Sequence, residues 1–309
     1  MSNDHINITR FLQGINSAQD EAVFAIKTAS GDFKIVQTVK DWRKGQKSTE
    51  ILALEFGTSL IDLLHHELNL VSLDEKGLLR LGVLVINDEV NAHRYGMRLM
   101  GSIAEALIVR GCNDGVLTNR IWAKYASRSL TYTNRFDRYK SIGTGLRSTE
   151  LYHPTKYNPG DTQRDIIWVK KEDIISQLLM AKHSKFRDIT AGLQIKVSND
   201  GLSYLREDLL TDRYEVPLVY FDFNNDYHRL LDFIHKQKLG IDLETDFLRG
   251  RDIDSAMHDE LKYYWSLLSD LIRGKITLDY LLRITTDNHP ITEALSRAGH
   301  PTSSDIIVL

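Results

Sequence analysis

The chain has 309 residues, of which 42% are hydrophobic and 26% are charged, and its formal net charge is −3. These values are typical of a soluble globular protein with one large domain or two ordinary ones. The single cysteine, Cys112, excludes an internal disulfide framework and a cysteine-based zinc cluster. No run approaches the roughly 18 apolar residues of a membrane span, and the N-terminus lacks the apolar core of a signal peptide. We therefore expect a cytoplasmic protein without a membrane partner.

Residues 1–90 are expected to form a separate N-terminal α/β region. The apolar stretches 21–29 and 33–39 flank a short Ser-Gly-Asp turn and predict a β-hairpin. A helical pattern covers 49–67, and a further apolar stretch covers 78–86.

The stretch 90–110 predicts a helix whose second half is apolar almost all round and is therefore buried. Glu105 lies within this apolar half. A buried carboxylate requires a partner, which can be a lysine, a set of hydrogen-bond donors or a metal ion. Gly111 follows the apolar run and is expected to end the helix.

A basic segment comes next, with 11 Lys or Arg and 4 Asp or Glu between residues 117 and 171. Aromatic residues such as Trp122, Tyr125, Tyr132 and Phe136 are interleaved with its cations. Cations with aromatic rings between them suit a phosphate backbone and stacking on bases. The alternative is a solvated face whose aromatic residues belong to the core. The predicted nucleic-acid-binding residues are Arg120, Lys124, Arg128, Arg135, Arg138, Lys140 and Arg147.

Asp165 precedes the apolar run 166–169, which is typical of a central strand. An acid at the mouth of a buried strand is well placed to hold a cation, and a cap to the following turn is the alternative. The stretch 172–185 then predicts a helix rich in Ile and Leu.

The stretch 191–198 predicts a strand with one apolar face and one face that carries Gln194 and Lys196. A lysine held against a half-buried sheet needs a partner, because burying an unpaired charge is costly. The alternative is an edge strand whose lysine reaches solvent. A helix over 202–210 and a strand over 214–223 follow, and the three elements predict a parallel crossover.

Helices are also expected over 226–237 and, from Asp252 onward, over 255–273, 278–283 and 291–297. The helix expected over 255–273 carries a stripe of aromatic and leucine side chains. This stripe suits either a dimer interface or core packing.

The order of elements between residues 95 and 235 resembles the PD-(D/E)XK nuclease superfamily. Glu105 matches the carboxylate on the first helix of the family, Asp165 matches the strand-leading acid, and Lys196 matches the motif lysine. Gln194 stands where the family most often has Glu. The separation of 29 residues between Asp165 and Gln194 is long for the family, and it requires the helix predicted between them.

The resemblance implies an α/β (α+β) protein with a restriction-endonuclease-like core over 91–240, in which helices flank a mixed central sheet. The region 1–90 and a C-terminal helical region, 241–309, would lie outside this core. The implied activity is metal-dependent DNA cleavage in restriction or anti-phage defence. Mg²⁺, or Mn²⁺ in its place, would bind to Asp165, Gln194 and Glu105, with Lys196 beside the scissile phosphate.

Cleavage of both strands usually takes two active sites, so the expected partners are DNA, a second copy of the chain and a further defence protein. Three other functions remain open. The first is an inactive nucleic-acid-binding module in which Gln194 marks a lost metal site, and the second is a toxin-like RNA nuclease. The third is a helical interaction protein that oligomerises through residues 250–309.

Overall fold

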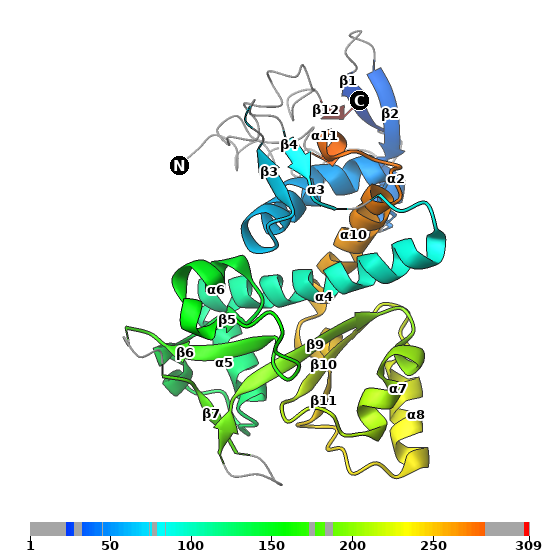
Figure 1. Ribbon diagram of the computed structural model, residues 1–309. Coiled ribbons are helices and arrows are strands. Elements are labelled where there is room, and N and C mark those ends of the chain that lie inside the picture. Colours follow the sequence, from blue (N-terminus) through cyan, green and yellow to red (C-terminus); the bar gives the residue numbers. More distant parts are fainter. Residues whose placement is uncertain are drawn as a thin grey trace. The chain divides into compact units, whose positions relative to one another are not determined.

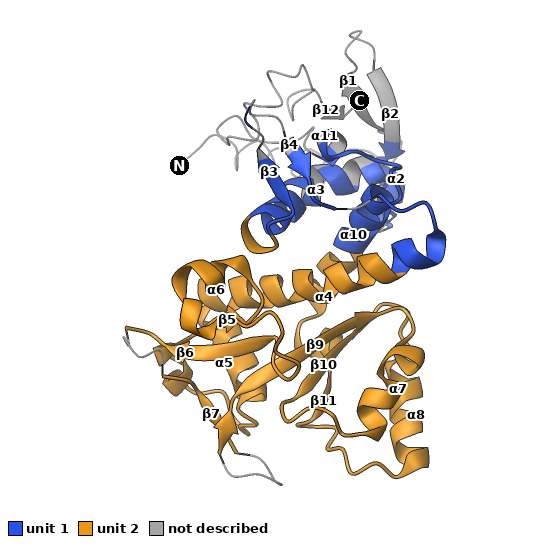
Figure 2. Cartoon of the chain, in the orientation of Figure 1, with its two compact units in different colours: residues 1–65, 69–93, 263–309 blue, residues 66–68, 94–262 orange. Residues whose placement is uncertain are grey.

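The computed structural model divides the chain into two compact units (Figure 1). Unit 1 comprises residues 1–65, 69–93 and 263–309, and unit 2 comprises residues 66–68 and 94–262 (Figure 2). Residues 241–262 thus belong to the same unit as the predicted core, and the last part of the chain shares a unit with its first part. The residues described are 23–27, 33–44, 46–73, 75, 79–83, 85–172, 177–182, 188–281 and 306–308.

Unit 2 contains a five-stranded mixed sheet in the order β11-β10-β9-β6-β5 (Figure 1). Strands β9, β10 and β11 are parallel, whereas β6 is antiparallel to both of its neighbours. This arrangement confirms the prediction of an α/β fold with a mixed sheet flanked by helices. The strands are β5 (Tyr139–Gly143), β6 (Ile166–Lys170), β9 (Gly192–Ser198), β10 (Leu218–Asp222) and β11 (Phe247–Arg249).

Strands β6 and β10 are largely apolar on both faces because helices cover both faces of the sheet. One side packs against leucines and isoleucines of α7 (Gly201–Leu210) and α8 (Tyr227–Gln237), which form a buried cluster with Tyr220. On the other side, Trp168 of β6 donates its indole N–H to Asn119 of α5 (Val116–Ala126) at 2.8 Å. The predicted crossover is confirmed as the parallel unit β9-α7-β10. Strand β9 lies between two neighbours, so the edge-strand interpretation of Lys196 is wrong.

Helix α4 (Glu89–Asp114) confirms the predicted buried helix but not its predicted end. Gly111 lies inside the helix and does not adopt the left-handed conformation that ends helices. Gly115, which separates α4 from α5, is extended. The prediction failed because a glycine is tolerated within a long helix when tertiary packing supports that helix.

The helix predicted over 172–185 is wrong for the residues described there. Glu172 has a φ of 58°, which turns the chain, and Leu178 forms a β-bridge with Val169. Strand β7 (Met180–Ala181) then pairs with β8 (Ile189–Thr190). The described residues of the insertion before β9 therefore extend the β structure, and Leu178 among them pairs with Val169 near the end of β6.

Unit 1 contains a three-stranded antiparallel sheet in the order β12-β1-β2. Pairing of β1 (Val23–Lys27) with β2 (Phe33–Thr38) confirms the predicted hairpin, and α3 (Thr49–Asp62) confirms the helix after it. The all-helical C-terminal prediction is wrong at β12 (Ile306–Val308), since this segment pairs with β1. The helix predicted over 291–297 lies outside the described residues.

The remaining elements are short, apart from one long helix near the C-terminal side. None of the described helices combines the length and the hydropathy that crossing a membrane requires. The elements not yet given are α2 (Val39–Arg43), the π-helical turn η1 (Leu63–Glu67), β3 (Val71–Leu73), β4 (Leu79–Leu81), η2 (Asn134–Arg138), α6 (Arg147–Tyr152), η3 (Pro154–Lys156), α9 (Gly250–Ile253), α10 (Ser255–Ile272) and α11 (Leu278–Leu281).

Candidate functional site

Asp165 and Gln194 meet across neighbouring antiparallel strands, although 29 residues separate them in the sequence. Pairing of β6 with β9 places Ile166 opposite Leu193, which brings Asp165 opposite Gln194. Oδ2 of Asp165 accepts the side-chain amide of Gln194 at 2.7 Å and the backbone N–H of Ile195 at 2.6 Å. The structure therefore joins two of the predicted site residues directly.

Two buried oxygens in this region have no hydrogen-bond partner among the described residues. They are Oε1 of Gln194, whose residue is 5% exposed, and Oε1 of Glu105 on α4. Buried polar atoms in native proteins almost always have a partner. Two unpartnered oxygens near the carboxylate of Asp165 therefore suit a bound cation.

The electrostatics of the two acids support the same interpretation. Burial raises the pKa of Glu105 well above its ordinary value, and the negative charge of Asp165 raises it further. Burial also raises the pKa of Asp165 to about 6, against the lowering effects of the Ile195 N–H, the Lys196 charge and the Gln194 amide. A divalent cation would offset this cost, because it favours the charged form of both acids.

Gly143, the last residue of β5, allows the sheet to approach α4 at Glu105. A Cβ atom on Gly143 would lie 2.3 Å from Oε1 of Glu105 and 2.6 Å from the side chain of Leu146. The position therefore excludes any larger residue while Glu105 keeps its place. Sequence reasoning missed Gly143, although a glycine at the end of an apolar strand is a usable signal of close backbone approach.

Lys196 lies on the same face of β9 as Gln194 and is half-buried. Its Nζ is 5.5 Å from the ring centroid of Tyr214 and 5.7 Å from that of Tyr204 on α7. Within the described part of the chain, no carboxylate lies in ion-pair contact with this ammonium group. The two tyrosine rings therefore hold the amine without neutralising it. Both tyrosines were missed, since nothing in their spacing indicates that they meet a lysine on another element.

A third acid lies near Glu105 and was not predicted. Glu67, at the end of the π-helical turn η1, accepts a hydrogen bond from the hydroxyl of Ser148 at 2.6 Å. Its negative charge contributes to the raised pKa of Glu105. Single π-helical turns are frequent at functional sites, but the sequence 63–67 carries no signal that distinguishes one.

The chemical type of these oxygen donors suits a hard cation. Glu105 and Asp165 supply carboxylates and Gln194 supplies an amide oxygen, which are the ligands that Mg²⁺ and Mn²⁺ prefer. No group of three or more His, Cys, Asp or Glu able to hold a metal ion occurs among the residues that the structure describes. A metal here would therefore depend on the amide oxygen of Gln194 as its third ligand.

Two of the predicted nucleic-acid-binding arginines are tied into the fold. Arg128 donates to Asp246 at 2.8 Å and to the backbone carbonyl of Glu215 at 2.9 Å, and its side chain is 8% exposed. Arg120 forms a two-bond ion pair with Asp137, at 2.8 and 2.6 Å. These cations are committed to partners within the protein.

The other residues of the basic segment differ in their exposure. Trp122 and Phe136 are core residues, whereas Tyr132 is exposed. Part of the segment therefore matches the alternative interpretation, in which a solvated face carries aromatic residues that belong to the core. Of the other predicted cations, Arg135 and Arg138 are exposed, and Lys124, Lys140 and Arg147 are half-buried.

Together, the fold and the site define an α/β protein in which two acids, a glutamine and a lysine gather beside the centre of a mixed sheet. No family model, curated protein or solved structure matches the chain. The interpretation of the site therefore stands on the contacts described above.

Proposed function

We propose that the chain is a metal-dependent endonuclease that hydrolyses phosphodiester bonds in DNA and has a restriction-endonuclease-like core. One observation carries this proposal: among the described residues, Oε1 of Gln194 and Oε1 of Glu105 are buried without a partner, and the carboxylate of Asp165 interacts with both residues and with the charge of Lys196. Oxygen donors that can hold a divalent cation, with a lysine ammonium group beside them, suit hydrolysis of a phosphodiester.

Asp165, Gln194 and Glu105 would hold Mg²⁺ or Mn²⁺. When bound, the metal lowers the pKa of a water molecule and polarises the phosphate. The ammonium group of Lys196 would stabilise the negative charge that develops on the phosphate oxygens. Tyr204 and Tyr214 would orient this ammonium group, because their rings attract a cation without forming an ion pair with it.

Restriction-like or antiviral defence in the cytoplasm is the setting that we propose for this activity. A homodimer is part of the proposal, because cutting both strands of a duplex usually takes two active sites. The exposed cations of the basic segment, Arg135 and Arg138, would contact the DNA backbone, and a partner defence protein would direct the enzyme to its target.

Cleavage of supercoiled plasmid tests the proposal with wild type, Lys196→Ala and the control Lys236→Ala, an exposed lysine on α8. We expect nicking or linearisation in Mg²⁺ or Mn²⁺ but not in EDTA. Lys196→Ala should reduce cleavage at least 100-fold, and Lys236→Ala should leave it unchanged.

Equal cleavage by wild type and Lys196→Ala would refute the proposed site. Absence of cleavage, with salt-sensitive DNA binding that does not respond to Mg²⁺, would favour an inactive binding module. A labelled RNA substrate in a parallel reaction distinguishes a DNA enzyme from an RNA-cleaving one.

A further inference from the structure

The first half of α4 carries two arginines on the same face as Glu105. Arg94, Arg98, Gly101 and Glu105 follow one another at spacings of four, three and four residues, which places them on one side of the helix. All four belong to unit 2 (Figure 2). With a rise of about 1.5 Å per residue, Arg98 lies about 10 Å and Arg94 about 16 Å from Glu105 along the helix axis. This face therefore leads away from the candidate metal site.

Neither arginine is neutralised within the described part of the chain. Arg94 and Arg98 are exposed, and no described acid forms an ion pair or a hydrogen bond with either of them. The sequence has no Asp or Glu between Glu89 and Glu105. Like charges four residues apart on a helix repel each other and weaken the helix. A polyanion bound along this face would remove the repulsion, because it supplies the missing negative charge.

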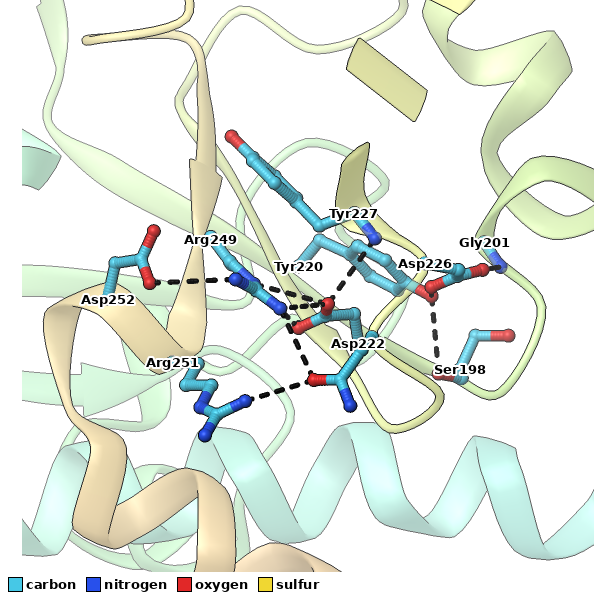
Figure 3. Close-up of polar contacts among 10 residues, drawn as sticks. Ser198, Gly201, Tyr220, Asp222, Asp226, Tyr227, Arg249, Arg251 and Asp252 are labelled. Atoms are coloured by element: carbon cyan, nitrogen blue, oxygen red, sulfur yellow. Dashed lines mark hydrogen bonds and ion pairs between the residues drawn. The ribbon is translucent and has the colours of Figure 1, made fainter. Parts of the chain in front are cut away.

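Arg249 of β11, in the same unit, shows the opposite arrangement. It donates from Nη2 to the fully buried carboxylate of Asp222 at 2.7 Å, and its Nη1 lies 3.9 Å from Asp252 (Figure 3). An arginine held in this way stabilises the fold. Arg94 and Arg98 have no such role among the described residues, so their charges are available to a partner in solution.

The helix surface between Arg98 and Glu105 is open. A Cβ atom on Gly101 would meet no atom within 4 Å beyond its own helix. The glycine therefore presents bare backbone to an open space on this face. A bound chain that passes from Arg98 to Glu105 would meet no side chain of α4 at this position.

Arg98 is also close to the lysine of the candidate site. Nζ of Lys196 lies 5.7 Å from the ring centroid of Tyr204. Burial raises the pKa of Tyr204, nearby carboxylates that include Asp165 raise it further, and the charge of Arg98 lowers it. Asp165 and Arg98 are thus both within electrostatic range of this ring. The positive charge on α4 therefore continues the positive charge that Lys196 brings to the site.

We propose that the face of α4 formed by Arg94, Arg98 and Gly101 holds the phosphate backbone of duplex DNA next to the site of cleavage. This role rests on the proposed function, which places the reacting phosphate beside Glu105 and Lys196. For a duplex that runs along the helix, the two arginines would lie about three and about five base pairs from that phosphate, at about 3.4 Å per base pair. Contacts of this kind position a duplex without reading its sequence.

The test is binding of a short labelled duplex to the full chain in EDTA, in which metal-dependent cleavage does not occur. The variant Arg94→Gln/Arg98→Gln removes both charges, and Arg94→Lys/Arg98→Lys keeps them. The control Arg229→Gln/Lys236→Gln removes two exposed cations from one face of α8. None of these four side chains forms an ion pair among the described residues, so the variants should fold, and thermal melts check this.

We expect the variant Arg94→Gln/Arg98→Gln to bind the duplex at least tenfold more weakly than wild type, and the other two variants to stay within threefold of it. The slope of log K against the logarithm of the salt concentration should fall by about two in the glutamine variant, since each phosphate contact contributes about 0.9. Cleavage in Mg²⁺ at saturating DNA should stay within twofold of wild type, because these arginines hold the duplex and do not touch the reacting phosphate.

Wild-type affinity and salt slope in Arg94→Gln/Arg98→Gln would overturn the inference, as would absence of duplex binding by wild type at low salt. Loss of cleavage in Lys196→Ala would in that case leave the nuclease proposal standing. Arginine-dependent binding without cleavage in any metal would refute the nuclease activity and still support a DNA-binding face on α4. Poly-glutamate is the second probe. If it binds as tightly as DNA and with the same dependence on the two arginines, the occupant is an acidic protein segment and the inference is wrong.

Discussion

Gln194 donates its side-chain amide to Asp165 at 2.7 Å, so a neutral residue occupies the place next to the strand-leading acid. The same amide leaves its oxygen buried and without a partner in the described part of the chain. One side of Gln194 thus stabilises Asp165, and the other is available to a cation. This geometry makes a glutamine in this position compatible with the proposed cation site.

The substitution Gln194→Glu should make stability depend more strongly on metal. It replaces the donor to Asp165 by a carboxylate, so like charges then lie side by side near a buried Glu105. In EDTA at pH 8 we expect the free energy of unfolding to fall by about 2 kcal/mol, and Mg²⁺ to restore more stability than it gives to wild type. Urea denaturation with and without Mg²⁺ measures both effects. A variant as stable as wild type in EDTA would contradict the geometry.

The raised pKa of Asp165 predicts a specific dependence of stability on pH. The folded state holds the proton up to about pH 6, whereas the unfolded chain releases it near the ordinary value of 3.8. In EDTA the stabilisation that protonated Asp165 provides is therefore present at low pH. It is lost as the pH rises from about 4 to 6, and the free energy of unfolding falls by at most about 3 kcal/mol. Glu105, whose pKa is also raised, acts in the same direction.

Other acids titrate in this range, so the comparison with Asp165→Asn isolates the effect. Chemical denaturation of both proteins from pH 4 to pH 8 in EDTA provides the measurement. Wild type should lose stability relative to Asp165→Asn as the pH rises. If the difference between the two proteins has the opposite slope, Asp165 is stabilised in its charged form and the interpretation fails.

Two glycine-to-alanine substitutions should change the stability of the protein in opposite directions. Gly143→Ala places a methyl group 2.3 Å from Glu105, so it should destabilise the protein and displace the carboxylate. Gly101→Ala, on α4, meets no atom within 4 Å beyond its own helix and should stabilise by roughly 0.5–1 kcal/mol. Thermal melts and plasmid cleavage assays of the two variants test these effects. We expect cleavage to be lost only in Gly143→Ala. Unchanged stability in Gly143→Ala would show that the sheet is not packed against Glu105.

Arg128→Ala should reduce stability more than truncation of any other predicted nucleic-acid-binding residue. The substitution leaves Asp246 and the carbonyl of Glu215 without their donor. We expect a loss of about 2–3 kcal/mol in the free energy of unfolding, since breaking a largely buried ion pair is costly. Arg138→Ala, at an exposed position, should change stability by less than about 0.5 kcal/mol. Equal effects of the two substitutions in urea denaturation would refute this role for Arg128.

Local patterns in the sequence predicted much of the fold. The apolar runs around Trp168 and Tyr220, the buried half of α4 and the amphipathic α8 all follow from periodicity, because burial selects apolar residues at each element's own spacing. Periodicity alone also led to the helix predicted over 172–185, which is wrong for the described residues of this stretch. Its Ile and Leu residues fit a helix, but Leu178 pairs with Val169, and such pairing is not visible in local spacing.

The candidate site was predicted in part. Glu105, Asp165, Gln194 and Lys196 could be named because each is a polar residue on an apolar element. Their geometry could not be predicted, since it depends on strand register. The roles of Tyr204 and Glu67 follow from contacts between elements distant in sequence, and the pairing of Arg128 follows from a contact across 118 residues.

The pairing of β12 with β1 has a consequence for the order in which the chain assembles during translation. Strand β1 is synthesised before all of unit 2, but its partner β12 is synthesised after all of unit 2. Every residue of unit 2 is synthesised before β12, so unit 2 can fold as a domain while unit 1 still lacks a strand. Closure of the sheet in unit 1 is thus a long-range step, and it takes place only after all of unit 2 and then β12 have been translated.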